Sequence, residues 1–239
     1  MRIFFIAFSV LLLFSSCQMF GGKRIKGNGN IVTQDKTTGA FNSIDVSGAV
    51  AVHIRQDSIP SVRIETDENL LEYLDVSVDG NTLVIKTKNG YNLNPSKEII
   101  VYATAASFED IDASGACQII SDNLISGNRE LKIEASGATA INLQVTLPKL
   151  TTNVSGSGEV VLKGVAKEFS GSISGAGSIR GFDLITDKTE LDLSGAADAQ
   201  VTANQKLDVE VSGSGDVQYK GNANVNQKIS GAGSVKKVS

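Results

Sequence analysis

The chain has 239 residues and a formal net charge of −4, and 41% of its residues are hydrophobic. Its acidic balance, with no block of like charges, argues against a nucleic-acid partner. A single histidine and two cysteines supply too few ligands for a zinc site, so no metal and no cofactor are predicted. The length suffices for one elongated domain or two joined sheets.

Residues 1–16 have the features of a secretory address. Arg2 gives a positive start, and residues 3–14 form an apolar run that is too short to remain as a membrane-spanning helix. The run ends in Leu13-Phe14-Ser15-Ser16-Cys17, which resembles the signal of bacterial lipoproteins. This resemblance implies cleavage before Cys17 and attachment of lipid to it. The alternative is a plain secretory signal in which the cysteine is incidental.

Residues 17–29 are predicted to hold the lipidated cysteine and a short flexible tether. Acyl chains on Cys17, palmitate among them, would anchor the protein to a membrane without spanning it. Gln18 is not acidic, so in proteobacterial systems it would not signal retention at the inner membrane. We therefore predict a bacterial cell-envelope protein, an outer-membrane lipoprotein, whose periplasmic or surface exposure stays open.

Residues 30–109 are predicted to form an irregular N-terminal β region. The stretch 67–74 is its one helix-like piece, about two turns long. Asp79-Gly80-Asn81 separates two short alternating segments, 76–78 and 83–85, which predicts a β-hairpin.

Residues 110–239 are built from a repeat of Ser-Gly followed by Ala or Ser. From Gly115 onward the glycine recurs after 22, 19, 19, 20, 18 and 18 residues. Self-similarity at a short fixed period is the mark of a stacked repeat. One further copy lies in the N-terminal region. The eight glycines are Gly48, Gly115, Gly137, Gly156, Gly175, Gly195, Gly213 and Gly231.

Apolar and polar residues alternate around each of these glycines. The positions two before and four after the glycine are apolar in every copy, and most residues between them are polar or small. Period-two alternation is typical of half-buried strands, and glycine suits a tight turn with positive φ. We therefore predict an all-β fold, a parallel β-helix-like β-solenoid with stacked coils of about 18–22 residues. An antiparallel sandwich with glycine turns is the alternative.

Three N-terminal segments, taken in order with the Ser-Gly units, resemble a known family. The segments are Gly29-Asn30-Ile31-Val32, Phe41-Asn42-Ser43-Ile44-Asp45-Val46-Ser47-Gly48 and Glu65-Thr66-Asp67-Glu68-Asn69-Leu70-Leu71. The family is called "putative auto-transporter adhesin head GIN domain", and the resemblance covers nearly the whole mature chain. It implies a β-helix-like extracytoplasmic module, often on a lipoprotein, with adhesion as its suggested role. It offers no catalytic residues to carry over.

Carboxylates occupy outward positions at equal distances from several glycines. In stacked coils these would be neighbours as the pairs Asp112/Glu134, Asp192/Glu210 and Asp198/Asp216. If the carboxylates are close, they could bind Ca²⁺ or share a proton, and we interpret them as a candidate acidic binding surface. The alternative is a solvated acidic face that keeps the solenoid from aggregating.

No catalytic residues are predicted. His53 lies in a strand-like run, and Ser155-Gly156-Ser157-Gly158 lies in a repeat corner, not at a strand-to-helix elbow. Cys117 occupies a small-residue position, which predicts a buried side chain and not a reactive thiol.

The sequence therefore predicts a non-catalytic envelope lipoprotein, an adhesin-like binding or structural module. The partners expected are the membrane, through lipid on Cys17, and an envelope protein or glycan. A second copy could pair with the last coil, which reaches Ser239 without an evident cap. The alternative function is a carbohydrate-active β-helix enzyme, a polysaccharide lyase or hydrolase that uses the paired carboxylates.

Overall fold

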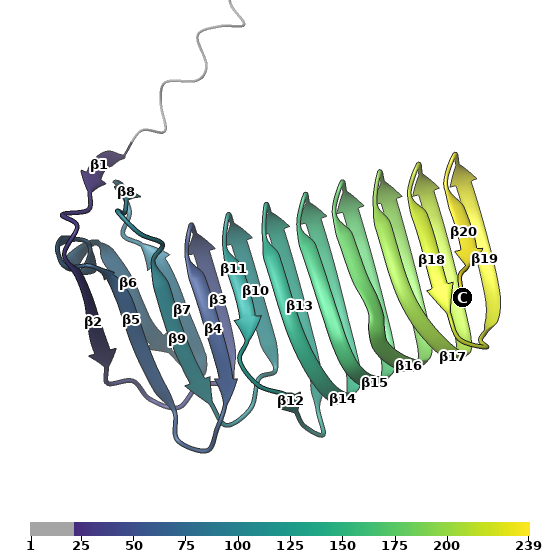
Figure 1. Cartoon of the computed structure of the whole chain (residues 1–239), viewed down its shortest axis with the longest axis horizontal. Helices are drawn as coiled ribbons and strands as arrows, with labels where there is room; N and C mark the ends of the chain where they lie inside the picture. The colour runs from purple at the N-terminus through teal and green to yellow at the C-terminus, as the bar shows by residue number, and fades with distance from the viewer. Residues whose placement is uncertain (1–21) are drawn as a thin grey trace, which may run out of the picture.

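The computed structural model describes residues 22–239, which are almost entirely β-structure (Figure 1). Strands account for 72% of the described residues and helix for 3%. The signal peptide predicted over residues 1–16 and the lipidation site Cys17 lie outside the described residues. Within residues 22–239, no helix is both long enough and apolar enough to cross a bilayer.

The Ser-Gly repeats wind into a β-solenoid of about seven turns, whose coils lie side by side along the long axis (Figure 1). Each central coil is one long strand that begins after one repeat glycine and ends at the next repeat glycine. The strand bends on the side of the stack opposite the glycines. Neighbouring coils pair in parallel throughout, which confirms the predicted solenoid. The strands of the stack are β3 (Ser43–Gly48), β4 (Ala51–Gln56), β10 (Asp110–Gly115), β11 (Gln118–Ser121), β12 (Ile125–Ser126), β13 (Glu130–Gly137), β14 (Ala140–Gly156), β15 (Glu159–Gly175), β16 (Ser178–Gly195), β17 (Asp198–Gly213), β18 (Asp216–Lys220), β19 (Asn224–Gly231) and β20 (Ser234–Lys237).

The eight repeat glycines align from coil to coil in one column, which we call the glycine edge. Their φ angles lie between 87° and 132°, a region that L-residues with a side chain adopt only at a cost. The carbonyl oxygen of each glycine except the last accepts a hydrogen bond from the N–H that follows the next glycine, as from Ser157 to Gly137 at 2.8 Å. The alternative of an antiparallel sandwich is therefore wrong for the repeats.

The glycine edge joins two sheet faces. The strand segments that lead into the glycines form the pre-glycine face, which runs from β3 and β10 to β19. The segments that follow the glycines form the post-glycine face, which runs from β4 and β11 to β18 and β20. Along both faces alternate side chains point inward, and the buried aliphatic columns of the two faces meet in one continuous core.

The coil of β15 has a glycine where several other coils have an aliphatic residue. Gly171 occupies an inward position of β15, in register with Thr152 and Leu191 on the adjacent coils. The ring of Phe169 and the tip of Leu191 fill the space: a Cβ atom on Gly171 would lie 3.1 Å from Phe169 Cζ and 3.0 Å from Leu191 Cδ2. The large and small residues on the same strand are therefore complementary in volume.

The N-terminal end of the stack combines parallel and antiparallel pairing. The strands β7 and β9 pair in parallel with β3 and β4, although they follow them in the chain. Beyond them β6 pairs with β7, β5 with β9, and β2 with β5, all antiparallel. The bounds here are β1 (Lys23–Lys26), β2 (Ile31–Lys36), β5 (Ser61–Asp67), η2 (Glu68–Tyr73), β6 (Leu74–Asp79), β7 (Thr82–Thr87), β8 (Tyr91–Asn94) and β9 (Ile100–Ala105). The predicted helical piece and the hairpin at residues 79–81 are both confirmed.

Asp67 joins three separate segments of this end. Its buried carboxylate accepts hydrogen bonds from the backbone N–H of Gly29 at 2.7 Å, and from the backbone N–H and hydroxyl of Ser96 at 2.8 and 2.7 Å. Burial on its own would raise the pKa of Asp67, but the hydrogen bonds from Ser96 and Gly29 outweigh it and hold the pKa below its usual range. The ionised form is thus the one that ties the end together.

Replacing Asp67 with alanine is expected to lower the free energy of unfolding by about 1–3 kcal/mol, because the donors of Gly29 and Ser96 lose their acceptor. Urea unfolding checks this, with hydrogen exchange at those two amides as the local readout. Since a lowered carboxyl pKa adds stability above the unfolded-state value, the wild type should lose this advantage as the pH falls through the lowered pKa. Asp35→Ala is the control, because Asp35 only pairs with Arg63 at the surface. An equal loss in both variants would contradict the assigned role.

At the C-terminal end of the stack, no further described strand covers the last coil. Among the described strands, β19 pairs with β17 and β20 with β18, and neither has a neighbour on its outer side. The side chain of Ile229, which continues a core column, is 39% exposed. The stack therefore ends in two open strand edges.

Candidate functional site

The predicted acidic pairs of the pre-glycine face lie in one column. Asp112 is in register with Glu134, and Asp192 with Glu210, and all four side chains are exposed. The column crosses the whole face. From the N-terminal side its members are Asp45, Asp112, Glu134, Asn153, Ser172, Asp192, Glu210 and Lys228. Two acidic segments are therefore separated by two neutral residues.

The first segment, which we call the acidic triplet, consists of Asp45, Asp112 and Glu134. The ion pairs found among residues 22–239 involve none of the three. Desolvation, followed by the negative charges of Asp45 and Glu134 on either side, raises the pKa of Asp112. The triplet is therefore a place where the protein holds negative charge that its own side chains do not neutralise.

Replacing Asp112 with asparagine is expected to raise the free energy of unfolding at pH 7 by about 0.5 kcal/mol, because it removes repulsion between adjacent strands. A carboxyl whose pKa is raised in the folded state binds its proton more tightly there. The wild type should therefore gain stability as the pH falls from the raised pKa toward the usual value for aspartate, and the variant should lose that gain. Thermal melts between pH 3.5 and 7 measure both effects. Asp79→Asn, on the hairpin, is the control, and an identical pH dependence in wild type and D112N would contradict the assignment.

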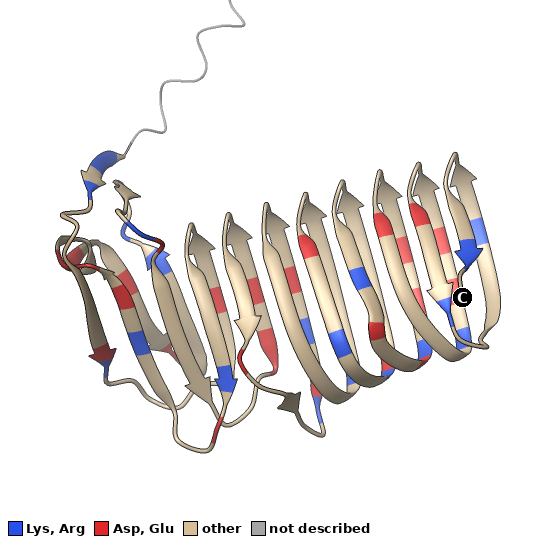
Figure 2. Cartoon of the chain, in the orientation of Figure 1, with Lys and Arg blue, Asp and Glu red and all other residues tan. Residues whose placement is uncertain are grey.

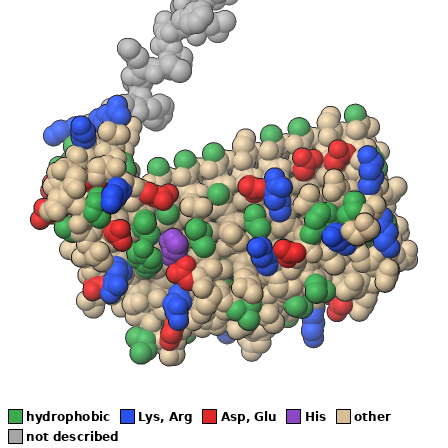
Figure 3. Space-filling view, viewed as in Figure 1, with side chains coloured by type: hydrophobic (Ala, Val, Ile, Leu, Met, Phe, Trp, Pro, Cys, Tyr) green, Lys and Arg blue, Asp and Glu red, His purple; other side chains and the backbone are tan. Residues whose placement is uncertain are grey.

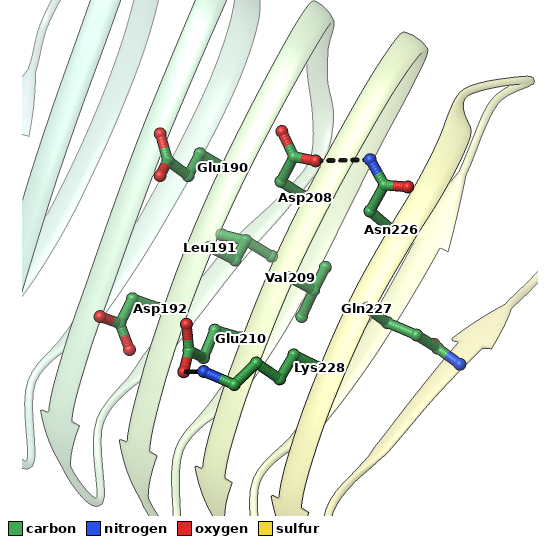
Figure 4. A pocket seen from close by; sticks show the side chains of 9 residues that line it. All are labelled: Glu190, Leu191, Asp192, Asp208, Val209, Glu210, Asn226, Gln227 and Lys228. Atoms are coloured by element: carbon green, nitrogen blue, oxygen red, sulfur yellow. Dashed lines mark hydrogen bonds and ion pairs between the residues drawn. The ribbon is translucent and has the colours of Figure 1, made fainter.

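The second segment is partly neutralised by the last coil. Lys228 Nζ lies 2.5 Å from Glu210 Oε1, and Asn226 donates to Asp208 at 2.9 Å (Figure 4). These side chains border a surface hollow over β16, β17 and β19. The floor of the hollow includes Leu191 and Val209, whereas its rim is charged. Asp192 and Glu210 are thus adjacent, as predicted, but Glu210 already has a cationic partner.

The third predicted pair lies on the post-glycine face. The backbone N–H of Asp216 donates to Asp198 Oδ1 at 3.2 Å, which confirms that the two residues are neighbours on adjacent coils. Asp216 in turn accepts a hydrogen bond from the Ser234 hydroxyl at 2.5 Å. In the part of the chain described, no group of three or more His, Cys, Asp or Glu side chains converges as a metal site would require. The carboxylates form rows and not a calcium cage.

One contact that the sequence did not indicate is the pair between His53 and Asp122, whose Nδ1 and Oδ1 atoms are 2.8 Å apart. The His53 ring also lies beside Tyr102, with centroids 5.3 Å apart. The aligned registers of β4, β9 and β11 bring these residues together. The contact between His53 and Tyr102 could have been predicted only from the pairing of β9 with β4. The repeat period does not indicate that pairing.

Cys117 is buried, as predicted from its small-residue position, with 2% of its surface exposed. Burial raises the pKa of the Cys117 thiol, which disfavours the reactive thiolate. Over the visible face of the solenoid, charges of both signs are interspersed with apolar and neutral polar residues (Figure 3). The geometry offers extended rows of polar groups on a rigid stack.

The chain matches the sequence model of a known family. The sequence model of the family described as "Putative auto-transporter adhesin, head GIN domain" matches residues 40–223. The chain belongs to this family. The match runs from just before β3 to just after β18, so it covers the stack except β19 and β20, and most of its N-terminal end. The resemblance inferred from the sequence is confirmed, and a cell-envelope or surface location accords with an adhesin family.

Solved structures share the architecture of this GIN domain. A protein of Parabacteroides distasonis described as "Putative lipid binding protein" is 28% identical with a TM-score of 0.72, over 91% of this chain and 100% of that one. A putative adhesin of the same organism is 27% identical with a TM-score of 0.76, over 90% and 100%. A putative adhesin of Bacteroides fragilis has a TM-score of 0.84 at 23% identity, over 90% and 100%, and shows the fold alone. No curated protein matches the chain.

Proposed function

We propose that this GIN-domain protein is a non-catalytic, adhesin-like binding module, held at the outer membrane of the bacterial envelope by lipid on Cys17. The observation that carries the proposal is the family match across the repeat coils. Two features support it: the lipoprotein-like signal that ends at Cys17, and rows of short polar side chains on a rigid stack.

The anchor is tested by growing cells that express the full chain with radiolabelled palmitate. The wild type should incorporate label and fractionate with the outer membrane, and Cys17→Ala should do neither. Digestion of the protein by protease added to intact cells then distinguishes exposure on the cell surface from exposure to the periplasm. A labelled Cys17→Ala chain, or an unlabelled wild type, would overturn the anchor.

We propose further that the acidic triplet is the part of the pre-glycine face that binds, and that it takes a cationic group of an envelope protein or glycan. Its three exposed carboxylates have no cationic partner among the described residues, whereas Glu210 is paired with Lys228. Attraction to an unneutralised acidic row is long-ranged and weakens with salt.

Arrays of basic peptides and of amino-sugar-containing glycans test the binding role. The wild type should bind a subset in a salt-dependent manner, and Asp45→Asn/Asp112→Asn/Glu134→Gln should lose about tenfold in affinity, as expected for removal of a few exposed charges. Asp192→Asn/Asp198→Asn/Asp216→Asn is the matched control on the other carboxylates. Absence of any binding would overturn the adhesin-like role, and an equal loss in the control would overturn the assignment to the triplet. Turnover of a polysaccharide would favour the enzyme instead.

The remaining partner that we propose is a second copy of this chain, which would pair with the open edges of β19 and β20. Unpaired strand edges can add another strand. The test is sedimentation of the protein over a hundredfold range of concentration, with Ile229→Asp as the variant. A monomer at every concentration would overturn self-association.

A further inference from the structure

We propose that a basic ribbon at the N-terminal end binds the anionic headgroups of the membrane that carries the lipid anchor. The basic ribbon consists of β1, β8 and Lys88. The inference deepens the proposed function, since it rests on attachment of lipid at Cys17. It assigns to this end of the molecule a second contact with the membrane, made by folded residues.

The basic ribbon is a defined structural element. The strands β1 and β8 form a two-stranded parallel sheet of their own, apart from the large sheet of the solenoid (Figure 1). Backbone hydrogen bonds close both of its ends, from Lys23 to Gly90 at 2.7 Å and from Gly27 to Asn94 at 3.0 Å. The amide of Asn69 in η2 donates to the Lys26 carbonyl at 2.9 Å. The ribbon is therefore held at a fixed place on the N-terminal end, and the prediction of a flexible tether over residues 17–29 is wrong for residues 23–26.

Its charge is of one sign. Residues 22–26 and 88–97 contain five basic residues and no acidic one, in a chain whose net charge is −4. Lys23, Arg24, Lys26 and Lys88 are exposed, and the ion pairs among residues 22–239 include none of them. Basic residues gather on this end, next to the point where the described chain begins (Figures 2 and 3).

An aromatic pair accompanies the charges. Tyr91 is in register with Lys23, is 38% exposed, and its ring centroid lies 4.7 Å from that of Tyr73. Tyrosine is favoured at membrane–water interfaces, because its ring is apolar and its hydroxyl can stay hydrated. The neighbouring carboxylate of Glu72 raises the pKa of Tyr73, so its hydroxyl stays neutral.

The short distance along the chain between Cys17 and the ribbon identifies the membrane as the binding partner of the ribbon. Lys23 comes six residues after Cys17, so a fully extended tether can separate the two by no more than about 20 Å. A lipid on Cys17 therefore keeps the ribbon within about two Debye lengths of the headgroups under physiological salt. An anionic membrane surface attracts each nearby lysine or arginine, and an acyl anchor combined with a basic patch holds better than either alone. The other end of the stack, with β19 and β20, would then point away from the anchor (Figure 1).

The test uses the mature chain, residues 17–239, with Cys17→Ser so that no lipid is attached. Binding is measured by co-sedimentation with vesicles of phosphatidylcholine alone, or of phosphatidylcholine with 30% phosphatidylglycerol, at 50 and 500 mM NaCl. The ribbon variant is Lys23→Gln/Arg24→Gln/Lys26→Gln. The matched control removes the same charge from the opposite end, as Lys228→Gln/Lys236→Gln/Lys237→Gln. Circular dichroism melts verify that both variants are folded.

The wild type should bind the anionic vesicles and release them at high salt. The ribbon variant should lose about fivefold per charge, about a hundredfold in all, whereas the control should change by twofold or less. Equal losses in the two variants, or equal binding to the two vesicle types, would overturn the proposal. Because no lipid is attached in this test, its result is independent of acylation. Failure of palmitate labelling would overturn the anchor and leave the vesicle result intact.

Discussion

Replacing Gly175 with valine is expected to lower the free energy of unfolding by about 3–5 kcal/mol. Gly175 has φ of 122°, and a Cβ atom at this position would lie 2.6 Å from the carbonyl oxygen of Gly156. That oxygen accepts the hydrogen bond from the Ala176 N–H at 2.8 Å, which is part of the ladder along the glycine edge. Valine therefore combines a strained backbone with a clash that pushes two coils apart.

Thermal melts followed by circular dichroism measure the effect. For a chain of this size the loss corresponds to a fall in Tm of about 10 °C. Gly127→Val is the matched control, because Gly127 is exposed, has no positive φ, and its nearest neighbour to an added Cβ is Leu147 at 3.8 Å. A loss below about 1 kcal/mol in G175V, or an equal loss in both variants, would show that the edge does not require glycine.

The same geometry explains why so much of the stack could be predicted from the sequence. In a solenoid each coil pairs only with its neighbours, so aligning the copies on one glycine also aligns every residue around it. Asp112 beside Glu134, and Asp192 beside Glu210, follow directly from that alignment. The burial of Cys117 follows in the same way from the small residues at its position.

The N-terminal end could not be predicted in this way, because strand order there is not set by a period. The strands β7 and β9 add to the outer edges of β3 and β4, while β10 and β11 add to their other edges. An alternating apolar pattern fixes which side chains face the core, but it does not say which open edge a strand will join. The link from Asp67 to Ser96, 29 residues later, likewise has no signal in composition or spacing.

The candidate site was predictable in part for a related reason. The register places carboxylates side by side, yet their charge balance depends on where long side chains reach. Lys228 extends back to Glu210, so this half of the acidic column is partly neutralised, and the acidic triplet at the other half is not. The pairing of His53 with Asp122 depends on the turn after β11 and escaped prediction because that turn has no counterpart in the other copies.

Replacing Phe169 with alanine is expected to cost about 3–5 kcal/mol, because the ring is 2% exposed and fills the space that Gly171 leaves open. The adjacent coils hold Leu150 and Thr152 on β14, and Thr189 and Leu191 on β16. The coils two positions away on either side indicate how the space could be filled differently. The equivalent inward positions hold Leu131 and Ile133 on β13, and Leu207 and Val209 on β17. A coil with leucine and an aliphatic residue at these two positions should therefore pack as well as the native one.

The double variant Phe169→Leu/Gly171→Val is accordingly expected to come within about 1 kcal/mol of the wild type, as volume-conserving core changes do. Gly171→Val alone should cost about 1–3 kcal/mol, since its Cβ would crowd the flexible tips of Ile179 and Leu191 as well as the Phe169 ring, and Phe169→Leu alone should leave a void. Urea unfolding of the four proteins gives the interaction energy of the cycle, which should be about 1–3 kcal/mol in favour of the double variant. Additive losses would mean that Phe169 and Gly171 do not share one space.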